Sequence, residues 1–242
     1  MPKYTPCRVS PALLCVLALL PLMAGAQGDQ PPKGAELHAH IDFPSHKAKD
    51  HLPSAVLWLK ALPAEPPSRA LPPGHFTLVQ KNRMFSPHLL VVPVGSVVAF
   101  PNQDPFFHNV FSLFNGKRFD LGLYEAGKSK DVVFSREGVS YIFCNIHPEM
   151  SAVVLALSTP YFAIADHDQN LRIENVPAGE YEVHVWVEGL TSADLDRMVR
   201  RIHLGAGQSE SLSLAAGNIS GEPASHLNKF GQPYPQPAKP SY

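Results

Sequence analysis

Three side chains suited to binding a soft metal ion lie within residues 144–150, which read Cys-Asn-Ile-His-Pro-Glu-Met. The thiolate of Cys144, the imidazole of His147 and the thioether of Met150 follow one another at steps of three residues. Ligands of these types together suit copper. Two histidines and a cysteine in one plane, with a weak axial methionine, make a blue-copper site that transfers single electrons. The spacing therefore predicts three of the four ligands of such a site.

The fourth ligand, a second histidine, must come from elsewhere in the chain, and His108 is the candidate. It lies in a phenylalanine-rich stretch after an apolar segment that ends at Phe100. Loops at the same end of a β-sandwich come together, which would bring His108 to the Cys144 loop. His88 is the rival, but it lies farther from Cys144 in the sequence and begins an apolar segment. The sequence leaves open a surface role for His108 and a core role for Met150.

The neighbours of these residues indicate the setting of the site. Asn109 is expected to hydrogen-bond to the Cys144 loop and hold the two loops together. His147, next to a proline, is expected to lie nearest the surface. A fully liganded copper has no open coordination position, which argues against substrate chemistry. Nearby apolar side chains are expected to keep the metal dry and tune its potential, and these are Phe106, Phe107, Phe143 and Pro148.

The N-terminus has the features of a secretory signal peptide. Lys3 and Arg8 precede an apolar run at 12–20, and Ala-Gly-Ala at 24–26 fits a cleavage site. We therefore expect cleavage near Ala26 and export of the mature chain. The apolar run is too short to span a bilayer, and no other stretch is apolar enough. No membrane span is predicted.

Export gives Cys144 a particular meaning. The other cysteines, Cys7 and Cys15, leave with the signal peptide. A lipoprotein interpretation would use Cys15, but that residue lies inside the apolar run. The thiol that remains cannot form an internal disulfide in an oxidising compartment. A buried cysteine acting as a small apolar residue is the alternative, but His147 and Met150 beside it favour a metal.

The composition favours short strands over long helices, with 25 Pro, 16 Gly and only 17% charged residues. A net charge of −1 and the lack of a basic run argue against nucleic acid as a partner. The class predicted is all-β. Apolar segments separated by turns predict an antiparallel sandwich, with strands at 55–59, 75–80, 88–92, 96–100, 130–135, 139–144 and 151–158.

A second β module is expected after Pro160. Residues 181–187 alternate cleanly between apolar and polar. Thr191, with Asp194 three residues later, predicts a short capped helix over 191–198. Further strands are expected at 161–165, 171–173, 200–204 and 210–214.

The flanking regions are polar and rich in proline. Residues 27–52 are predicted to be a flexible arm that carries His38, His40, His46 and His51. These histidines either collect copper or are simply solvated, and we favour the second interpretation. Residues 221–242 are predicted to be a Pro-rich disordered tail. The expected organisation is thus signal peptide 1–26, arm 27–52, copper domain 53–158, second module 159–220 and tail 221–242.

At this point the sequence resembles the cupredoxin family, over roughly residues 55–157. The resemblance rests on Val94-Gly95, Val98-x-Phe100-x-Asn102-x-Asp104, His108-Asn109-Val110 and Cys144-x-x-His147-x-x-Met150. The spacing before the methionine is similar to that of the amicyanin branch. The full arrangement resembles plastocyanin-like periplasmic proteins labelled methylamine utilisation proteins. The resemblance implies a Greek-key β-barrel or sandwich with one type 1 copper, exchanging electrons with a periplasmic redox protein such as a c-type cytochrome or a dehydrogenase.

Residues 175–181, Asn-Val-Pro-Ala-Gly-Glu-Tyr, are similar to the carboxypeptidase regulatory-like, or transthyretin-like, β-sandwich. This short match implies a fold and no peptidase activity. It also sets the chain apart from a simple cupredoxin.

Four interpretations follow from these patterns. One is a purely structural β module, and only Cys144 with its neighbours argues against it. The leading hypothesis is an electron carrier with one copper. The alternative is a copper-binding or trafficking protein without redox turnover, motivated by the histidines of the arm. An enzyme would need further histidine clusters around an open copper. Because only one His-x-His occurs, at 38–40, we expect no enzymatic activity.

Overall fold

The structure is a computed structural model, and it describes residues 33–43, 52–63, 71–113, 116–217 and 227–234. The predicted signal peptide lies outside the described residues, as do His46 and His51 of the predicted arm. The described residues include no helix with the length and hydropathy that a membrane span requires.

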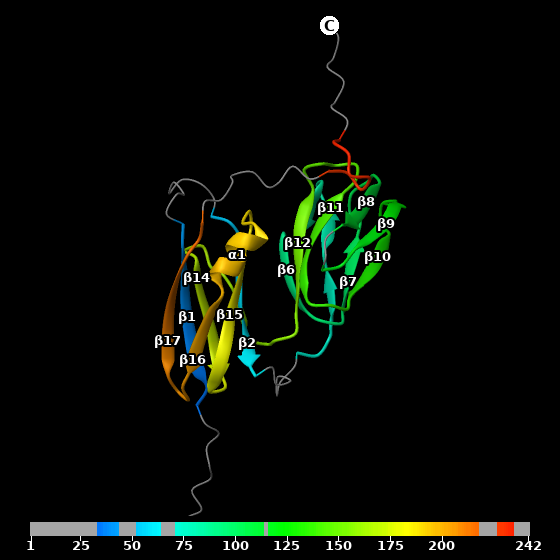
Figure 1. Ribbon diagram of the computed structural model, residues 1–242. Helices are drawn as coiled ribbons and strands as arrows, with labels where there is room; N and C mark the ends of the chain where they lie inside the picture. The colour runs from blue at the N-terminus through cyan, green and yellow to red at the C-terminus, as the bar shows by residue number, and fades with distance from the viewer. Residues whose placement is uncertain (1–32, 44–51, 64–70, 114–115, 218–226, 235–242) are drawn as a thin grey trace, which may run out of the picture. The chain divides into compact units, whose positions relative to one another are not determined.

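Strands make up 56% of the described residues, which also contain one short helix, and this confirms the predicted all-β class (Figure 1). They belong to two β-sandwiches, each with its own core of buried side chains. In chain order one sandwich is inserted into the other. We call them the inserted sandwich, built from the strands between residues 75 and 157, and the flanking sandwich, built from the strands before and after it.

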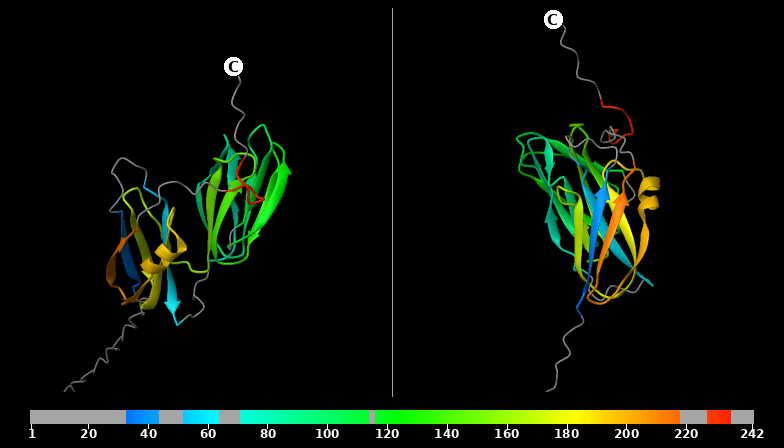
Figure 2. Two further views of the ribbon diagram at one scale, coloured as in Figure 1. Left: turned by 45° about the horizontal axis from the view of Figure 1, so that its top comes forward. Right: turned by 90° about the vertical axis from the view of Figure 1, so that its left-hand side faces the viewer.

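The flanking sandwich has a three-stranded sheet, β14-β1-β17, and a four-stranded sheet, β13-β2-β15-β16. In the right-hand view of Figure 2, β1 in blue lies beside β17 in orange. Its elements are β1 (Ala35–Asp42), β2 (Ala55–Leu62), β13 (Phe162–Ile164), β14 (Asn170–Val176), β15 (Gly179–Val187), α1 (Ser192–Met198), β16 (Arg200–Leu204) and β17 (Ser209–Ala215).

Local sequence patterns explain these elements. In β15 the apolar side chains of Tyr181, Val183 and Val185 alternate with polar ones and enter the core. Helix α1 begins after Thr191, whose hydroxyl accepts a hydrogen bond from the Asp194 backbone, while the Asp194 carboxylate accepts one from the Thr191 backbone. The predicted capped helix is therefore confirmed.

The prediction of a flexible arm is wrong for Ala35–Asp42, which form strand β1. This strand pairs antiparallel with β14 and parallel with β17. Leu37 and Ile41 are buried in the flanking core, whereas His38 and His40 point outward. The segment was judged by its histidines, which form the polar side of an alternating pattern. The other side consists of the small and apolar residues Ala35, Leu37, Ala39 and Ile41, which are buried and hold the segment in the sheet.

The predicted start of the copper domain at residue 53 is also wrong. Strand β2 pairs with β15 and β13 rather than with a strand of the inserted sandwich. Leu57 and Leu59 of β2 lie in the flanking core. The second module is therefore completed by two strands from the N-terminal side of the insertion.

The inserted sandwich has a three-stranded sheet, β10-β7-β3, a five-stranded sheet, β6-β12-β11-β8-β9, and a hairpin of β4 and β5. Its elements are β3 (His75–Thr77), β4 (Val79–Lys81), β5 (Met84–Ser86), β6 (Leu89–Pro93), β7 (Ser96–Pro101), β8 (His108–Ser112), β9 (Phe119–Tyr124), β10 (Ser129–Phe134), β11 (Gly138–Cys144) and β12 (Ser151–Leu157).

Two features of this sandwich differ from the sequence-based expectation. Its sheets are mixed, because β12 pairs parallel with β6 and β3 pairs parallel with β7. Parallel neighbours need a long connection between them, so this pairing has no local sequence signal. Within the described residues the sheets do not close into a barrel.

Candidate metal centre

Two adjacent strands bring the most distant of the predicted ligands together. Cys144 is the last residue of β11. His108 was predicted to lie in a loop, but it is the first residue of β8. The two strands pair antiparallel, with Cys144 opposite Val110. Because neighbouring strands lie less than 5 Å apart, side chains separated by 36 residues in the chain meet at one end of the sheet.

The ligand atoms of His108, Cys144 and His147 form a compact triangle. The Cys144 Sγ lies 3.5 Å from His108 Nδ1 and 3.6 Å from His147 Nδ1, and the two Nδ1 atoms are 3.2 Å apart. A single ion with bonds of about 2.0 Å to nitrogen and 2.3 Å to sulfur would hold such atoms about 3.1–3.8 Å apart. The three side chains therefore fit one small metal ion.

The loop that carries His147 is closed by its own backbone. The Met150 N–H donates to the His147 carbonyl at 3.0 Å, and the Cys144 N–H donates to the Met150 carbonyl at 3.3 Å. These bonds turn the chain back from β11 into β12. The turn places His147 over the thiol of Cys144.

Met150 is fully buried in the same core cluster as Cys144. This position fits an axial ligand and equally fits a core residue just before β12, which begins at Ser151. The axial role therefore stays a prediction, as does the choice of His108 over His88. His88 lies elsewhere, with its Nε2 2.7 Å from a carboxylate oxygen of Glu188.

Burial shifts the pKa values of two groups of the triangle toward their uncharged forms. Burial raises the pKa of the Cys144 thiol, although backbone N–H groups of Asn109, Ile146 and His147 act in the opposite direction. Burial, together with the charge of the neighbouring His108, lowers the pKa of His147. Neutral imidazoles and a thiol that loses its proton to a metal are what such a site requires.

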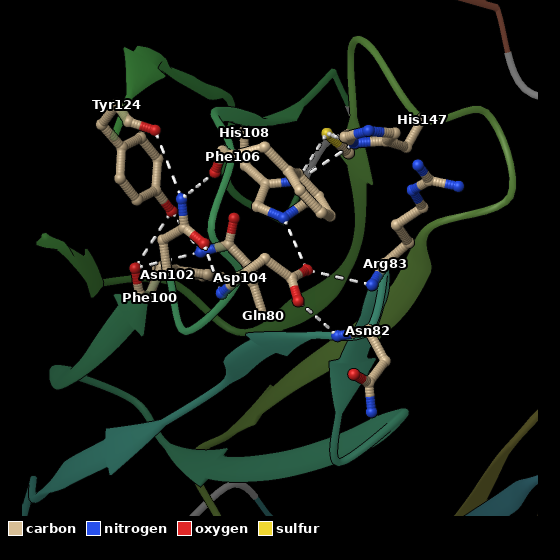
Figure 3. Close-up of polar contacts among 11 residues, drawn as sticks. Gln80, Asn82, Arg83, Phe100, Asn102, Asp104, Phe106, His108, Tyr124 and His147 are labelled. Atoms are coloured by element: carbon tan, nitrogen blue, oxygen red, sulfur yellow. Dashed lines mark hydrogen bonds and ion pairs between the residues drawn. The ribbon is translucent and has the colours of Figure 1, made fainter. Parts of the chain in front are cut away.

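The far side of the His108 ring is held by a carboxylate (Figure 3). His108 Nε2 lies 2.9 Å from Asp104 Oδ2, and both side chains are buried. Asp104 also accepts backbone N–H bonds from Asn82 at 2.6 Å and Arg83 at 3.0 Å. Burial opposes ionisation of Asp104, but these three donors outweigh it and lower its pKa.

A buried polar network supports the loop that carries Asp104 (Figure 3). The Asn102 amide donates to the Phe106 carbonyl at 2.7 Å and its oxygen accepts the Asp104 N–H at 2.9 Å. Gln80 donates to the Tyr124 hydroxyl, which in turn donates to the Phe100 carbonyl at 3.0 Å. Sequence reasoning did not assign a role to Gln80 or Tyr124. The sequence did contain one indication for Gln80, because it is a polar residue at a position where the strand alternation places a side chain in the core.

The predicted apolar setting is only partly present. The Phe106 ring lies against both imidazoles, with centroid distances of 5.3 Å to His108 and 5.4 Å to His147. Phe143 is buried against Phe111, and Phe107 and Pro148 are exposed. The strand alternation explains Phe143, since adjacent residues of β11 point to opposite faces.

Asn109 links the two ligand-bearing segments, but through its backbone. Its carbonyl accepts the Asn145 N–H at 2.9 Å. Its side chain instead donates to Asp120 Oδ1 at 2.6 Å, on β9. Asn109 therefore connects the two segments as expected, but the hydrogen bond comes from its backbone carbonyl, and its side chain binds Asp120 instead.

A short piece of the predicted disordered tail contacts the ligand loop. The Tyr234 hydroxyl donates to the Cys144 carbonyl at 2.9 Å. The Lys229 N–H donates to Asn145 Oδ1 at 2.9 Å, and its ammonium lies 2.8 Å from Asp120 Oδ2. The prediction of disorder is therefore wrong for residues 227–234, while the rest of the tail lies outside the described residues.

Comparison with known proteins places copper proteins among the similar solved structures. No protein-family model and no curated protein matches the chain. A purple cupredoxin from Nitrosopumilus maritimus is 28% identical over 34% of this chain and 99% of its own, with a TM-score of 0.31. An amicyanin variant in the Cu(I) state is 17% identical over 34% of this chain and 82% of its own, with a TM-score of 0.33.

A copper-containing nitrite reductase from Thermus scotoductus is also similar, with 24% identity and a TM-score of 0.34. The match covers 38% of this chain and 24% of the reductase, so it spans about a quarter of that enzyme. These likenesses are weak, and the assignment of the site rests on the geometry of His108, Cys144 and His147.

Proposed function

We propose that this chain is an exported electron-transfer protein with one type 1 copper, held by His108, Cys144, His147 and an axial Met150. The observation that carries the proposal is the triangle of two Nδ1 atoms and one thiol sulfur with edges of 3.2–3.6 Å. Two histidines, a cysteine and a nearby methionine are the ligand set of blue-copper sites. We propose that the inserted sandwich is a cupredoxin domain.

When bound, copper supplies single-electron exchange, and the protein residues supply the conditions for it. Cys144 gives up its thiol proton to act as a thiolate ligand. His108 is fixed inside the sandwich, and half-buried His147 lies nearer the surface. An electron would therefore pass most directly through the His147 edge. A rigid ligand set limits rearrangement between the two copper states.

The partner we propose is another redox protein of the periplasm, such as a c-type cytochrome or a dehydrogenase. Apolar side chains near the exposed edge support a weak, transient contact of small area. Phe107 is 53% exposed, and Ile146, next to His147, is 43% exposed. Export to the periplasm rests on the signal-peptide pattern that ends near Ala26.

A visible absorption spectrum tests the copper proposal. The chain without residues 1–26 is loaded with Cu(II) and compared with its Cys144→Ala variant. We expect an intense thiolate-to-copper band that a mild reductant bleaches and that the variant lacks. A protein that binds Cu(I) without this band would support the trafficking alternative. A protein that binds no copper would overturn both.

A further inference from the structure

A buried carboxylate bonded to a ligand histidine is the feature that the copper proposal does not by itself explain. Asp104 is 4% exposed and His108 is fully buried. The 2.9 Å contact joins Asp104 Oδ2 to His108 Nε2, on the opposite side of the ring from the Nδ1 atom that faces Cys144 (Figure 3). Burying an ion is costly unless it is well hydrogen-bonded. The placement of this charge therefore calls for a functional reason.

Backbone donors hold the carboxylate in one position. The N–H groups of Asn82 and Arg83 bind its two oxygens from the turn between β4 and β5. Both residues have φ near +57°, a left-handed conformation that is uncommon outside glycine, and it aims two successive N–H groups at one carboxylate. The Arg83 guanidinium lies over the Phe106 ring, with its carbon 5.3 Å from the centroid. Among the described residues, the hydrogen-bond partners of the carboxylate are that N–H pair and the imidazole of His108.

This arrangement fixes which nitrogen of His108 carries the proton. A carboxylate can only accept a hydrogen bond, so Nε2 must be the protonated nitrogen. The lone pair of Nδ1 is then free and directed at the position between Cys144 and His147. A carboxylate on the far nitrogen also makes an imidazole a stronger electron donor to a metal.

His147 differs in this respect. Within the described chain its side-chain contacts are with His108 and Cys144 through Nδ1 and with the ring of Phe106. The two imidazoles of the site are therefore unequal, one backed by a buried negative charge and the other open to its surroundings.

We propose that Asp104 is a positioning residue that locks the His108 tautomer and lowers the reduction potential by stabilising Cu(II) more than Cu(I). This inference rests on the proposed copper function. The extra electron density supplied through His108 interacts more strongly with the doubly charged ion. Loss of the carboxylate charge should therefore favour Cu(I).

The direct test compares Asp104→Asn with Asp120→Asn. Asp120 is a matched control, because it also accepts hydrogen bonds near the site, from Asn109 and Lys229, but it touches no ligand imidazole. We expect Asp104→Asn to shift the Cu(II)/Cu(I) preference about 10- to 100-fold toward Cu(I). That shift corresponds to a potential about 59–118 mV higher for a one-electron couple. The Asp120 variant should shift the preference much less.

A second measurement needs neither copper nor a variant. In the copper-free protein, ¹⁵N NMR of the histidine rings should show His108 with its proton on Nε2. A proton on Nδ1 would overturn the proposal even if Asp104→Asn fails to fold. A blue protein whose potential is the same with Asp104→Asn would refute the role of Asp104 and leave the copper function intact. A protein with the expected tautomer but no blue band would refute the copper function instead.

Discussion

The two sandwiches differ most in what they bury. The flanking core is built from aliphatic and aromatic side chains. Among the described residues outside the inserted sandwich, two polar residues are buried: Thr159, whose hydroxyl accepts the Tyr161 N–H at 3.1 Å, and Gln169, which donates to the Pro53 carbonyl at 3.1 Å. The inserted sandwich buries many polar groups, which are Gln80, Ser96, Asn102, Asp104, His108, Asn109, Ser112 and Ser140. Most of these gather at the end of the sheet that holds the thiol of Cys144.

Polar burial is costly, so its location is informative. In its described residues the flanking sandwich buries mostly apolar side chains. The inserted sandwich uses one end of its interior to fix His108, through Asp104 and the loop that Asn102 supports. The contrast separates a sandwich with a mostly apolar interior from one whose interior also carries the proposed metal site.

The histidines offer the largest test of this contrast. We expect His108→Ala to abolish the visible thiolate–copper band, because it removes one of three close ligands. The matched control is the double variant His38→Ala and His40→Ala, which removes two outward-facing imidazoles of β1. Visible spectra after Cu(II) loading check both.

The control should keep its full band. His38 and His40 lie within 3.4 Å of the carboxylates of Glu36 and Asp42, as histidines on a solvated strand face commonly do. Loss of copper uptake in the double variant would show that β1 contributes to metal capture and would favour the trafficking alternative.

The second test breaks the flanking core and leaves the site alone. Leu37 of β1 is 1% exposed. We expect Leu37→Ala to cost about 2–5 kcal/mol of unfolding free energy, the usual range for a buried leucine. Denaturant unfolding measures this cost, with His38→Ala, an outward-facing and half-buried neighbour on β1, as a control expected within about 0.5 kcal/mol of the parent.

The visible spectrum of Leu37→Ala should be unchanged below its unfolding transition. A cost as small as that of His38→Ala would mean that β1 is not docked, and that the segment behaves as the flexible arm expected from its composition.

What the sequence could predict was set by local patterns. The steps of three from Cys144 to Met150 predicted the loop in which Cys144 and His147 meet, and the structure brings His108 to both. Alternation of apolar and polar residues located β15, and the spacing of Thr191 and Asp194 located the capped start of α1. Besides β1, strands β5, β8 and β9 were not predicted. They are short or interrupted, so a period of two residues had little length in which to become visible.

What the sequence could not predict depends on contacts between distant residues. Strand β2 has an apolar pattern that fits either sandwich, and only its pairing with β15 assigns it. The bond from Asp104 to His108 requires the turn at Asn82 and Arg83, which comes from a separate hairpin. The contact of Tyr234 with Cys144 spans 90 residues, and no periodicity encodes it.

The smallest test concerns that last contact. Tyr234→Phe removes the hydroxyl that donates to the Cys144 carbonyl and keeps the ring. A hydrogen bond of this kind contributes about 1 kcal/mol, equivalent to about a fivefold change in a rate or an equilibrium constant. We expect a chelator to withdraw copper up to about fivefold faster from the variant, because the carbonyl next to the thiolate is less restrained.

The control is Phe230→Ala, which alters a 72% exposed residue of the same segment without removing a bond to the ligand loop. Equal release from the parent and Tyr234→Phe would mean that residues 227–234 rest on the site without stabilising it. In that case the proposed ligands of the inserted sandwich, with the buried polar groups around them, would retain copper without help from residues 227–234.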